Sequence, residues 1–171
     1  MSTINRGSAR IAVTLVRLAS TSDADQISLC IAAAFEPFRS SYTPAAFADT
    51  VLTSSQLRQR MAHMTIYVAI NPGQEVLGTV GCSIEGHTGH LRGMAVLPGA
   101  QGSGIAERLL KVVESDLIAA NCARLTLDTT LPLQRAIGFY KRHGFTPSGR
   151  IEDFFGMPLH EYEKRLLGAE P

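Results

Sequence analysis

The stretch from Gly89 to Phe145 constrains the fold of this 171-residue chain more than any other. Its pattern of apolar residues predicts a strand, a glycine-rich turn, a long helix, a second strand and a second helix. A strand, a crossover helix and a strand in one sheet make a parallel pair with a right-handed connection. The turn after the first strand then lies at the carboxyl edge of the sheet, where α/β proteins bind ligands.

The turn runs from Val96 to Ala106 and contains Gly99, Gly102 and Gly104. Glycine permits positive φ and leaves no side chain in the concavity of a turn. A helix that starts there offers unpaired backbone N–H groups and about half a positive charge to a phosphate. The chain lacks the Gly-Lys-Ser/Thr of a Walker loop and the three-glycine spacing of a dinucleotide fingerprint. The turn therefore indicates a phosphate site of another type.

Two blocks of this stretch resemble the GNAT superfamily of N-acetyltransferases. Residues Gln101 to Ala106, Gln-Gly-Ser-Gly-Ile-Ala, are similar to its coenzyme A signature, Gln/Arg-x-x-Gly-x-Gly/Ala. Residues Ala136 to Phe145 are similar to the Ala-x-x-x-Tyr-x-x-x-Gly-Phe block that follows the fifth strand of the family. The resemblance is clear from about Val76 to the C-terminus and looser over the first third.

The resemblance implies an α/β fold: a single-domain, GNAT-like mixed central sheet flanked by helices. We expect a flexible tail over residues 1–10 and one N-acetyltransferase domain over residues 11–171, since a chain of this length makes one compact domain. Strands are predicted at Ile11–Leu18, Thr65–Ile70, Val76–Ile84, His90–Val96, Leu125–Leu127, Phe145–Ile151 and His160–Leu166.

Helix boundaries follow from caps and prolines. Ser22 and Asp23 are predicted to cap a helix that ends near Pro37. Thr43 is predicted to cap a second helical region over Pro44–Met64, with a break near Thr53–Ser55. Four aromatic residues in this part of the chain fit either a substrate pocket or an ordinary core: Phe35, Phe38, Tyr42 and Phe47.

The family resemblance implies acetyl-CoA as co-substrate, direct acetyl transfer to a primary amine, and no metal. It also implies that a strand backbone holds the pantetheine arm and that the glycine turn wraps the pyrophosphate. A backbone N–H near Met94 would polarise the thioester carbonyl, an interaction worth roughly 3 kcal/mol in measured cases. The expected coenzyme-binding residues are Met94, Ala95, Val96, Gln101, Gly102, Ser103, Gly104, Ile105, Ala106 and Leu133.

Two side chains are the catalytic candidates. Tyr140 matches the general acid of the family, and a phenol with a pKa of about 10 can protonate a thiolate of pKa about 8.5 at modest cost; holding the sulfur, or packing, is the alternative role. His90 corresponds to the family's strand-four glutamate and suits a base, directly or through a water. Glu85 competes for that role, and a lone histidine at a strand start is often structural.

The chain departs from the family pattern at three positions. Leu133 replaces an asparagine that contacts the coenzyme, so a backbone contact is the remaining expectation there. Gln101 replaces an arginine and removes a fixed charge from the phosphate turn. Histidine instead of a carboxylate at position 90 keeps an alternative function open: a catalytically weak coenzyme-A-binding sensor or partner module.

Composition limits the classes of binding partner that we expect for this protein. A net charge of +1 argues against nucleic acid or an acidic membrane as the main partner. Four basic residues of one helix fit either a solvated face or an anion site: Arg135, Lys141, Arg142 and His143. Three widely spaced cysteines and the absence of a leader-like segment favour the cytoplasm. His87 and His90 have no third metal ligand nearby. The charged last strand is predicted to be an edge strand, able to pair across a homodimer.

Overall fold

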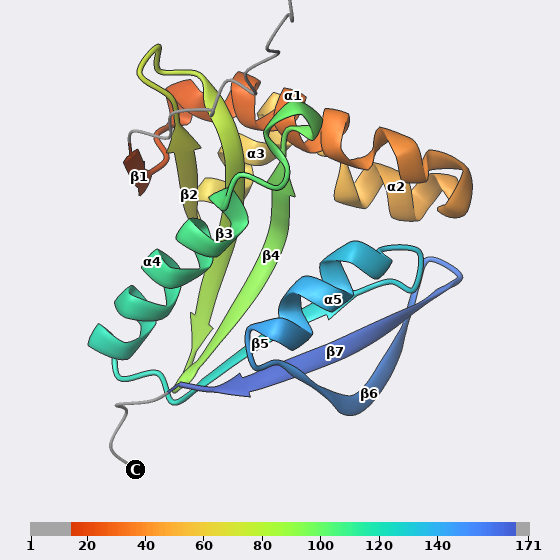
Figure 1. The fold of residues 1–171 in the computed structure, drawn as a ribbon. Coiled ribbons are helices and arrows are strands. Elements are labelled where there is room, and N and C mark those ends of the chain that lie inside the picture. The colour runs from red at the N-terminus through yellow and green to blue at the C-terminus, as the bar shows by residue number, and fades with distance from the viewer. Residues whose placement is uncertain (1–14, 167–171) are drawn as a thin grey trace, which may run out of the picture.

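The structure, a computed structural model, describes residues 15–166 and contains one mixed seven-stranded sheet (Figure 1). The strand order is β1-β2-β3-β4-β5-β7-β6, and among the neighbouring pairs β4 and β5 are parallel while the others are antiparallel. The strands are β1 (Leu15–Leu18), β2 (Thr65–Ile70), β3 (Val76–Glu85), β4 (Thr88–Val96), β5 (Arg124–Thr129), β6 (Thr146–Phe154) and β7 (Met157–Arg165). The predicted parallel pair and mixed sheet are confirmed.

Helices cover both faces of the sheet, with α4 and α5 on the near side of Figure 1 and α1, α2 and α3 on the far side. The helices are α1 (Ala24–Phe35), α2 (Pro44–Thr50), α3 (Ser54–Met61), α4 (Ile105–Ala119) and α5 (Gln134–Arg142). Short 3₁₀ turns occupy Thr21–Asp23, Glu36–Ser41 and Pro98–Ala100. The predicted start of the first strand at Ile11 and the predicted tail over residues 1–10 lie outside the described residues.

Each face of the sheet has its own apolar cluster. The α4–α5 cluster packs α4 and α5 on the sheet and includes Leu109, Val113, Leu127 and Tyr140. The α1–α3 cluster packs the other three helices on the opposite face and includes Ile27, Phe47, Leu57, Val68 and Ala95. Burial of these side chains is the main force that fixes both helical layers against the sheet.

Threonine caps explain why the second helical region is two helices. The Thr43 hydroxyl accepts the Ala46 N–H at 3.2 Å and starts α2, and the Thr53 hydroxyl accepts the Gln56 N–H at 3.3 Å and starts α3. The Gln56 side chain accepts the Thr53 N–H at 2.9 Å, which completes a capping box. The predicted break near Thr53–Ser55 is confirmed.

The last strand is not an edge strand, so that prediction is wrong. β7 lies between β5 and β6, because β6 and β7 form an antiparallel hairpin whose second strand pairs with β5. The charged side chains of β7 are matched within the protein: Glu163 with Arg124, and Lys164 with Glu114 of α4. A homodimer through this strand therefore loses its structural basis.

β4 and β5 pair only over their first halves. The paired residues run from Thr88 with Arg124 to Leu91 with Leu127, after which the two strands separate (Figure 1). On the other side of β4, the register with β3 passes from Arg92 opposite Gly81 to Ala95 opposite Thr79, so β4 uses three residue steps where β3 uses two. This is a β-bulge, and Gly93, with a φ of 69°, supplies the positive φ that it needs.

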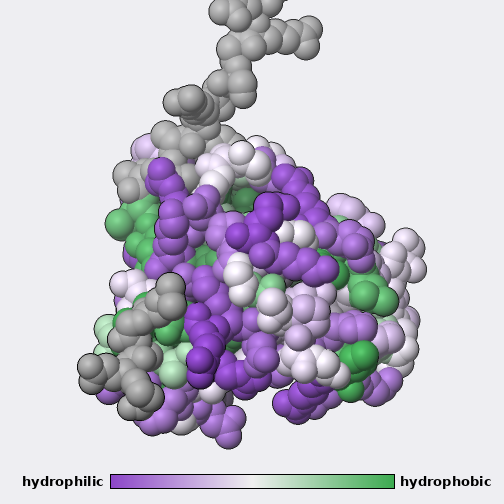
Figure 2. Space-filling view, turned by 60° about the horizontal axis from the view of Figure 1, so that its bottom comes forward, coloured by the Kyte–Doolittle hydropathy of each residue, from purple (hydrophilic) through white to green (hydrophobic). Residues whose placement is uncertain are grey.

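No helix among residues 15–166 is long and apolar enough to cross a membrane. On the face seen in Figure 2, hydrophobic residues form separate green patches between larger hydrophilic areas.

Candidate active site

The glycine turn leads from β4 into α4 and keeps a row of backbone donors open. Gly102 has a φ of 80° and Gly104, the N-cap of α4, has a φ of 84°. The hydrogen bonds found within residues 15–166 include no acceptor for the backbone N–H groups of residues 102–106. A Cβ atom built on Gly104 has no heavy atom within 4 Å. The turn is thus an open concavity of donors at a helix N-terminus, which suits a phosphate.

Arg135 of α5 reaches over this turn. Its Nη1 donates to Gln101 Oε1 at 3.1 Å, and its Nη2 lies 3.8 Å from a Cβ atom built on Gly102. Gln101 Nε2 in turn donates to the Val96 carbonyl at 3.2 Å, so the glutamine ties the turn to β4 and α5. Of the two interpretations of Arg135, a solvated face or an anion site, this placement beside the turn fits the second. A guanidinium beside the turn supplies the fixed positive charge that Gln101 lacks.

The separated half of β4 exposes main-chain groups toward β5. Met94 and Val96 direct their side chains to the α4–α5 cluster, whereas Ala95 is buried in the α1–α3 cluster. Because β5 has already separated from β4 here, the β5-facing edge of this segment has no strand to pair with. Such an edge is able to pair with an extended amide-containing chain, as an added strand would.

The main-chain groups of Leu133 are already engaged. Its N–H donates to the Thr130 carbonyl at 3.1 Å, and its carbonyl accepts the Ile137 N–H at 3.0 Å in the first turn of α5. Its side chain packs against the α1–α3 cluster. The Leu133 N–H is therefore not available as a donor for the backbone contact with the coenzyme that the sequence led us to expect.

Tyr140 is buried on the α4–α5 side of the sheet. Its ring makes edge contacts with Phe139 and Phe145, at centroid distances of 5.5 and 5.6 Å. Within residues 15–166 no hydrogen bond to its hydroxyl is found, and burial raises the pKa of this phenol above its ordinary value. The hydroxyl thus stays protonated at neutral pH and keeps its proton available to a bound group.

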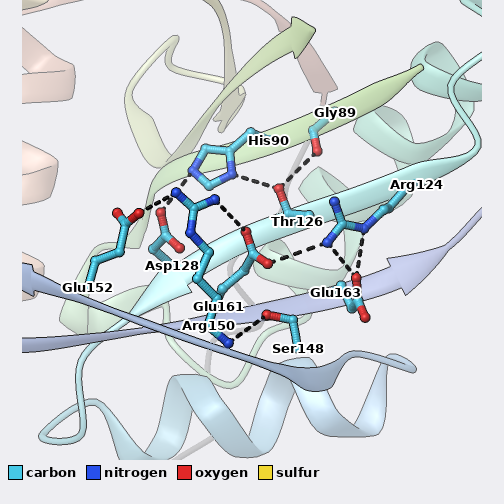
Figure 3. A network of polar contacts seen from close by, with 10 residues as sticks. All are labelled: Gly89, His90, Arg124, Thr126, Asp128, Ser148, Arg150, Glu152, Glu161 and Glu163. Atoms are coloured by element: carbon cyan, nitrogen blue, oxygen red, sulfur yellow. Dashed lines mark hydrogen bonds and ion pairs between the residues drawn. The ribbon is translucent and has the colours of Figure 1, made fainter. Parts of the chain in front are cut away.

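His90 lies on the opposite face of the sheet, in a hydrogen-bonded chain (Figure 3). Its Nδ1 is 2.7 Å from Thr126 Oγ1, and its Nε2 is 3.3 Å from Asp128 Oδ2. Thr126 Oγ1 is also 3.4 Å from the Gly89 carbonyl. The threonine hydroxyl can donate to neutral His90, or accept from protonated His90 and donate to Gly89. Both protonation states of the imidazole are therefore fully hydrogen-bonded.

Carboxylates are the most frequent charged groups around the hydrogen-bonded chain of His90. Figure 3 shows Asp128, Glu152, Glu161 and Glu163 with two arginines, Arg124 and Arg150. Arg124 Nε donates to Glu163 at 2.7 Å, while Glu161 lies between both guanidiniums, 3.4 Å from Arg124 and 3.8 Å from Arg150. With four acidic and two basic side chains, the network carries a negative excess that favours a cationic group.

The two base candidates lie at different distances from the bulge. Met94 is four residue steps after His90, roughly 13 Å along an extended strand. Glu85 pairs with Thr88 at the turn of the β3–β4 hairpin, and Thr88 is six residue steps before Met94, roughly 20 Å along the strand. His90 is thus the nearer of the two candidates, and Glu85 is the more remote.

The aromatic residues of the first third form core. Phe35, Tyr42 and Phe47 are buried and stack edge to face, with centroid distances of 6.3 and 6.2 Å. The Tyr42 hydroxyl is used by a 2.7 Å hydrogen bond with Thr130 Oγ1. Of the two interpretations of these residues, packing is the one that the structure shows.

Comparison with known proteins decides the family. A model of the acetyltransferase (GNAT) family matches residues 31–145. The chain belongs to this family. Acetyl-CoA-dependent acetyl transfer is general for the members of this family.

Relatives agree with this assignment. An IAA acetyltransferase of Azospirillum brasilense is 30% identical over 90 residues, which are 53% of this chain and 59% of that protein. This chain thus spans less than two thirds of that relative.

Solved GNAT structures share the fold. A GCN5-related N-acetyltransferase of Rhodopseudomonas palustris has a TM-score of 0.74 at 18% identity, with 91% of this chain and 98% of that chain covered. The PaiA N-acetyltransferase of Thermoplasma acidophilum, in complex with coenzyme A, has a TM-score of 0.72 at 16% identity, with 88% and 98% covered.

Proposed function

We propose that this GNAT protein transfers the acetyl group of acetyl-CoA directly to a primary amine. The observation that carries the proposal is the pair of unsatisfied main-chain surfaces at the end of β4: the unpaired edge after Leu91 and the open N–H groups of residues 102–106. An amide-containing pantetheine arm fits the first and a pyrophosphate fits the second. Arg135 adds a positive charge beside the turn.

Tyr140 is proposed as the group that meets the leaving sulfur. Burial raises its pKa, which by itself weakens it as an acid, but the same dry surroundings raise the pKa of a thiol as well. The difference between the pKa of the phenol and the pKa of the thiol therefore changes less than either pKa does. The hydroxyl stabilises the developing thiolate by a hydrogen bond and delivers its proton as the carbon–sulfur bond breaks.

On the other face, the acceptor ammonium is proposed to lie against the carboxylate-rich network, with Asp128 as its first contact. Asp128 was not among the site residues predicted from the sequence. His90 takes the ammonium proton through a water, and the Thr126 hydroxyl then turns from the imidazole to the Gly89 carbonyl. The amine that remains attacks the thioester carbonyl, which a backbone N–H near Met94 polarises.

Calorimetric titration with acetyl-CoA, followed by thiol release in the presence of an amine panel, tests this function. Gly104→Glu places a carboxylate in the open donor turn, and we expect it to weaken coenzyme binding by at least about tenfold because charge repulsion replaces phosphate binding. Gly149→Glu is the matched control, because Gly149 has a similar φ of 91° and equally open space but lies on β6. Equal loss in both variants would contradict the phosphate role of the turn. A wild-type chain that binds acetyl-CoA but acetylates no amine would contradict the enzyme activity.

The cytoplasmic location predicted above is also a proposal. It is supported by Cys30, Cys82 and Cys122, which are buried and free, as is usual in a reducing compartment.

A further inference from the structure

An open hollow of about 610 Å³ lies on the same face as His90, between α3 and β4. Its lining residues are Gln56, Gln59, Arg60, His63, Met64 and Arg92. The proposed acetyl transfer uses none of them.

The hollow lies beside the proposed amine position, because Arg92, which lines it, is two residues from His90 on β4. The register of β4 with β3 is regular from Thr88 to Arg92, so His90 and Arg92 point to the same face of the sheet. Their Cα atoms are two strand residues apart, about 7 Å. A ligand with its amine at His90 and Asp128 thus has its next few atoms over Arg92.

Two guanidiniums lie at the hollow, and only one of them is paired with a carboxylate. Arg92 Nη2 contacts Asp49 Oδ2 of α2 at 2.8 Å. Arg60 is half-buried, and among residues 15–166 no hydrogen bond or ion pair to its side chain is found. Burial and then the positive charge of Arg92 lower the pKa of Arg60. Arg60, Arg92 and Asp49 together leave one positive charge without a partner, at a partly desolvated position.

The other polar group at the hollow with a fixed orientation is also a donor. The Gln56 side-chain oxygen accepts the Thr53 N–H at 2.9 Å and the Thr53 hydroxyl at 3.1 Å, as part of the α3 capping box. Its amide nitrogen is thereby left to face away from the cap. A guanidinium and an amide donor without acceptors match a carboxylate or a phosphate, which arginine binds through two parallel hydrogen bonds.

We propose that the acceptor is a small amine that also carries a carboxylate or phosphate group, which Arg60 and Arg92 bind while the amine lies at His90 and Asp128. This inference rests on the proposed acetyl transfer. Acidic side chains at one end of the face and basic side chains at the other select a ligand with both charges. A polyamine or a strongly basic peptide would place a positive group beside Arg60 and Arg92, which is unfavourable.

Matched acceptor pairs test the charge requirement on the wild-type enzyme. The first set is aminoalkyl carboxylates of increasing length, each with its methyl ester; the second is aminoalkyl phosphates, each with its parent amino alcohol. We expect kcat/KM to be at least about tenfold higher for the charged member of the best pair, mainly through KM, because an anion held by guanidinium is a strong charge-assisted contact. The two sets show which anion is used. Added salt should reduce the preference.

Arg60→Gln removes the unpartnered charge, and we expect it to raise KM for the charged acceptor about tenfold while the uncharged member changes little. Arg58→Gln is the matched control, since Arg58 lies on the same helix but pairs with Asp25 outside the hollow. The affinity of the best charged acceptor for each protein in complex with coenzyme A can be measured by calorimetry. We expect Arg60→Gln to weaken this affinity more than Arg58→Gln does.

Equal kcat/KM for both members of every pair, or equal effects of Arg60→Gln and Arg58→Gln, would overturn the inference and leave the acetyl transfer intact. Absence of turnover with all amines would instead count against the proposed function itself.

Discussion

Where β4 and β5 separate, the two faces of the sheet offer different kinds of groups to a ligand: main-chain groups on one face and side chains on the other. On the α4–α5 side, the proposed coenzyme site consists of main-chain groups of β4 and of the turn into α4, which are neighbours in sequence. On the opposite side, the proposed acceptor site consists of side chains from β4, β5, β6, β7 and α3. A main-chain site needs glycines and a strand–helix junction, so it leaves a local signature. A side-chain site can change residue by residue while the scaffold stays fixed.

The variant with the largest expected effect is Tyr140→Phe, which removes the buried hydroxyl on the coenzyme side and leaves the ring. We expect kcat to fall by about 10²-fold, with coenzyme affinity retained, because a positioned proton donor typically contributes that much. Single-turnover measurement of thiol release shows the loss directly.

Tyr42→Phe is the control for this variant. It removes the hydroxyl of another buried tyrosine, one hydrogen-bonded to Thr130. We expect a stability loss of roughly 1 kcal/mol and a nearly unchanged kcat. If Tyr140→Phe behaved in the same way, Tyr140 would be a packing residue.

On the acceptor side, Asp128→Asn keeps a hydrogen-bonding side chain but removes its charge. We expect about a tenfold loss of kcat/KM for the amine and no change in coenzyme binding. The loss follows because Asp128 is the proposed first contact of the ammonium and lies 3.3 Å from His90 Nε2. An unchanged kcat/KM for the amine would remove Asp128 from the acceptor site.

Arg135→Gln should have a smaller effect, a rise of several-fold in KM for acetyl-CoA with kcat retained. The reason is that Arg135 is exposed and adds one screened charge to a turn built from backbone donors. Lys141→Gln on the same helix is the control. A response of KM to Arg135→Gln that does not weaken at high salt would contradict a purely electrostatic role.

Asp23→Asn should leave both sites unchanged and affect stability alone. Arg17 contacts the nearly buried Asp23 carboxylate at 2.8 Å, and its hydrogen bonds keep the pKa of Asp23 below the ordinary value. A lowered pKa stabilises the fold above the unfolded value of about 3.9, and this contribution is lost as the pH falls below it. We expect the variant to lose about 1–3 kcal/mol near neutral pH and less in acid, as urea unfolding at several pH values would show.

The sequence predicted the fold well where the pattern is local. The strand–turn–helix unit, the proline end of α1 and the Thr43 cap of α2 each depend on a few neighbouring residues, and all three are confirmed. At Thr53 the sequence predicted a break, and the structure adds the cap of α3. The position of β7 depends instead on which strand of a hairpin meets β5, and no local residue decides that.

The same division applies to the candidate site. The glycine turn was predicted from its local pattern and Tyr140 from the family resemblance, while Arg135 was left between a solvated face and an anion site. Asp128 and Arg60 were not predicted, because each acquires its place from pairing between distant segments. One signal for Asp128 was available: Thr126 and Asp128 alternate on β5, so they share the face of a histidine on the neighbouring parallel strand.

The bulge at Gly93 reverses the alternation of side chains along β4. Before it, the even-numbered His90 and Arg92 face the acceptor side; after it, the odd-numbered Ala95 faces that side, and Met94 and Val96 face the coenzyme side. One inserted residue therefore decides which side chains of β4 face the acceptor site and which face the coenzyme site. Deleting Gly93 would leave every side chain of the strand chemically unchanged, yet one of the two halves would present its residues to the wrong face.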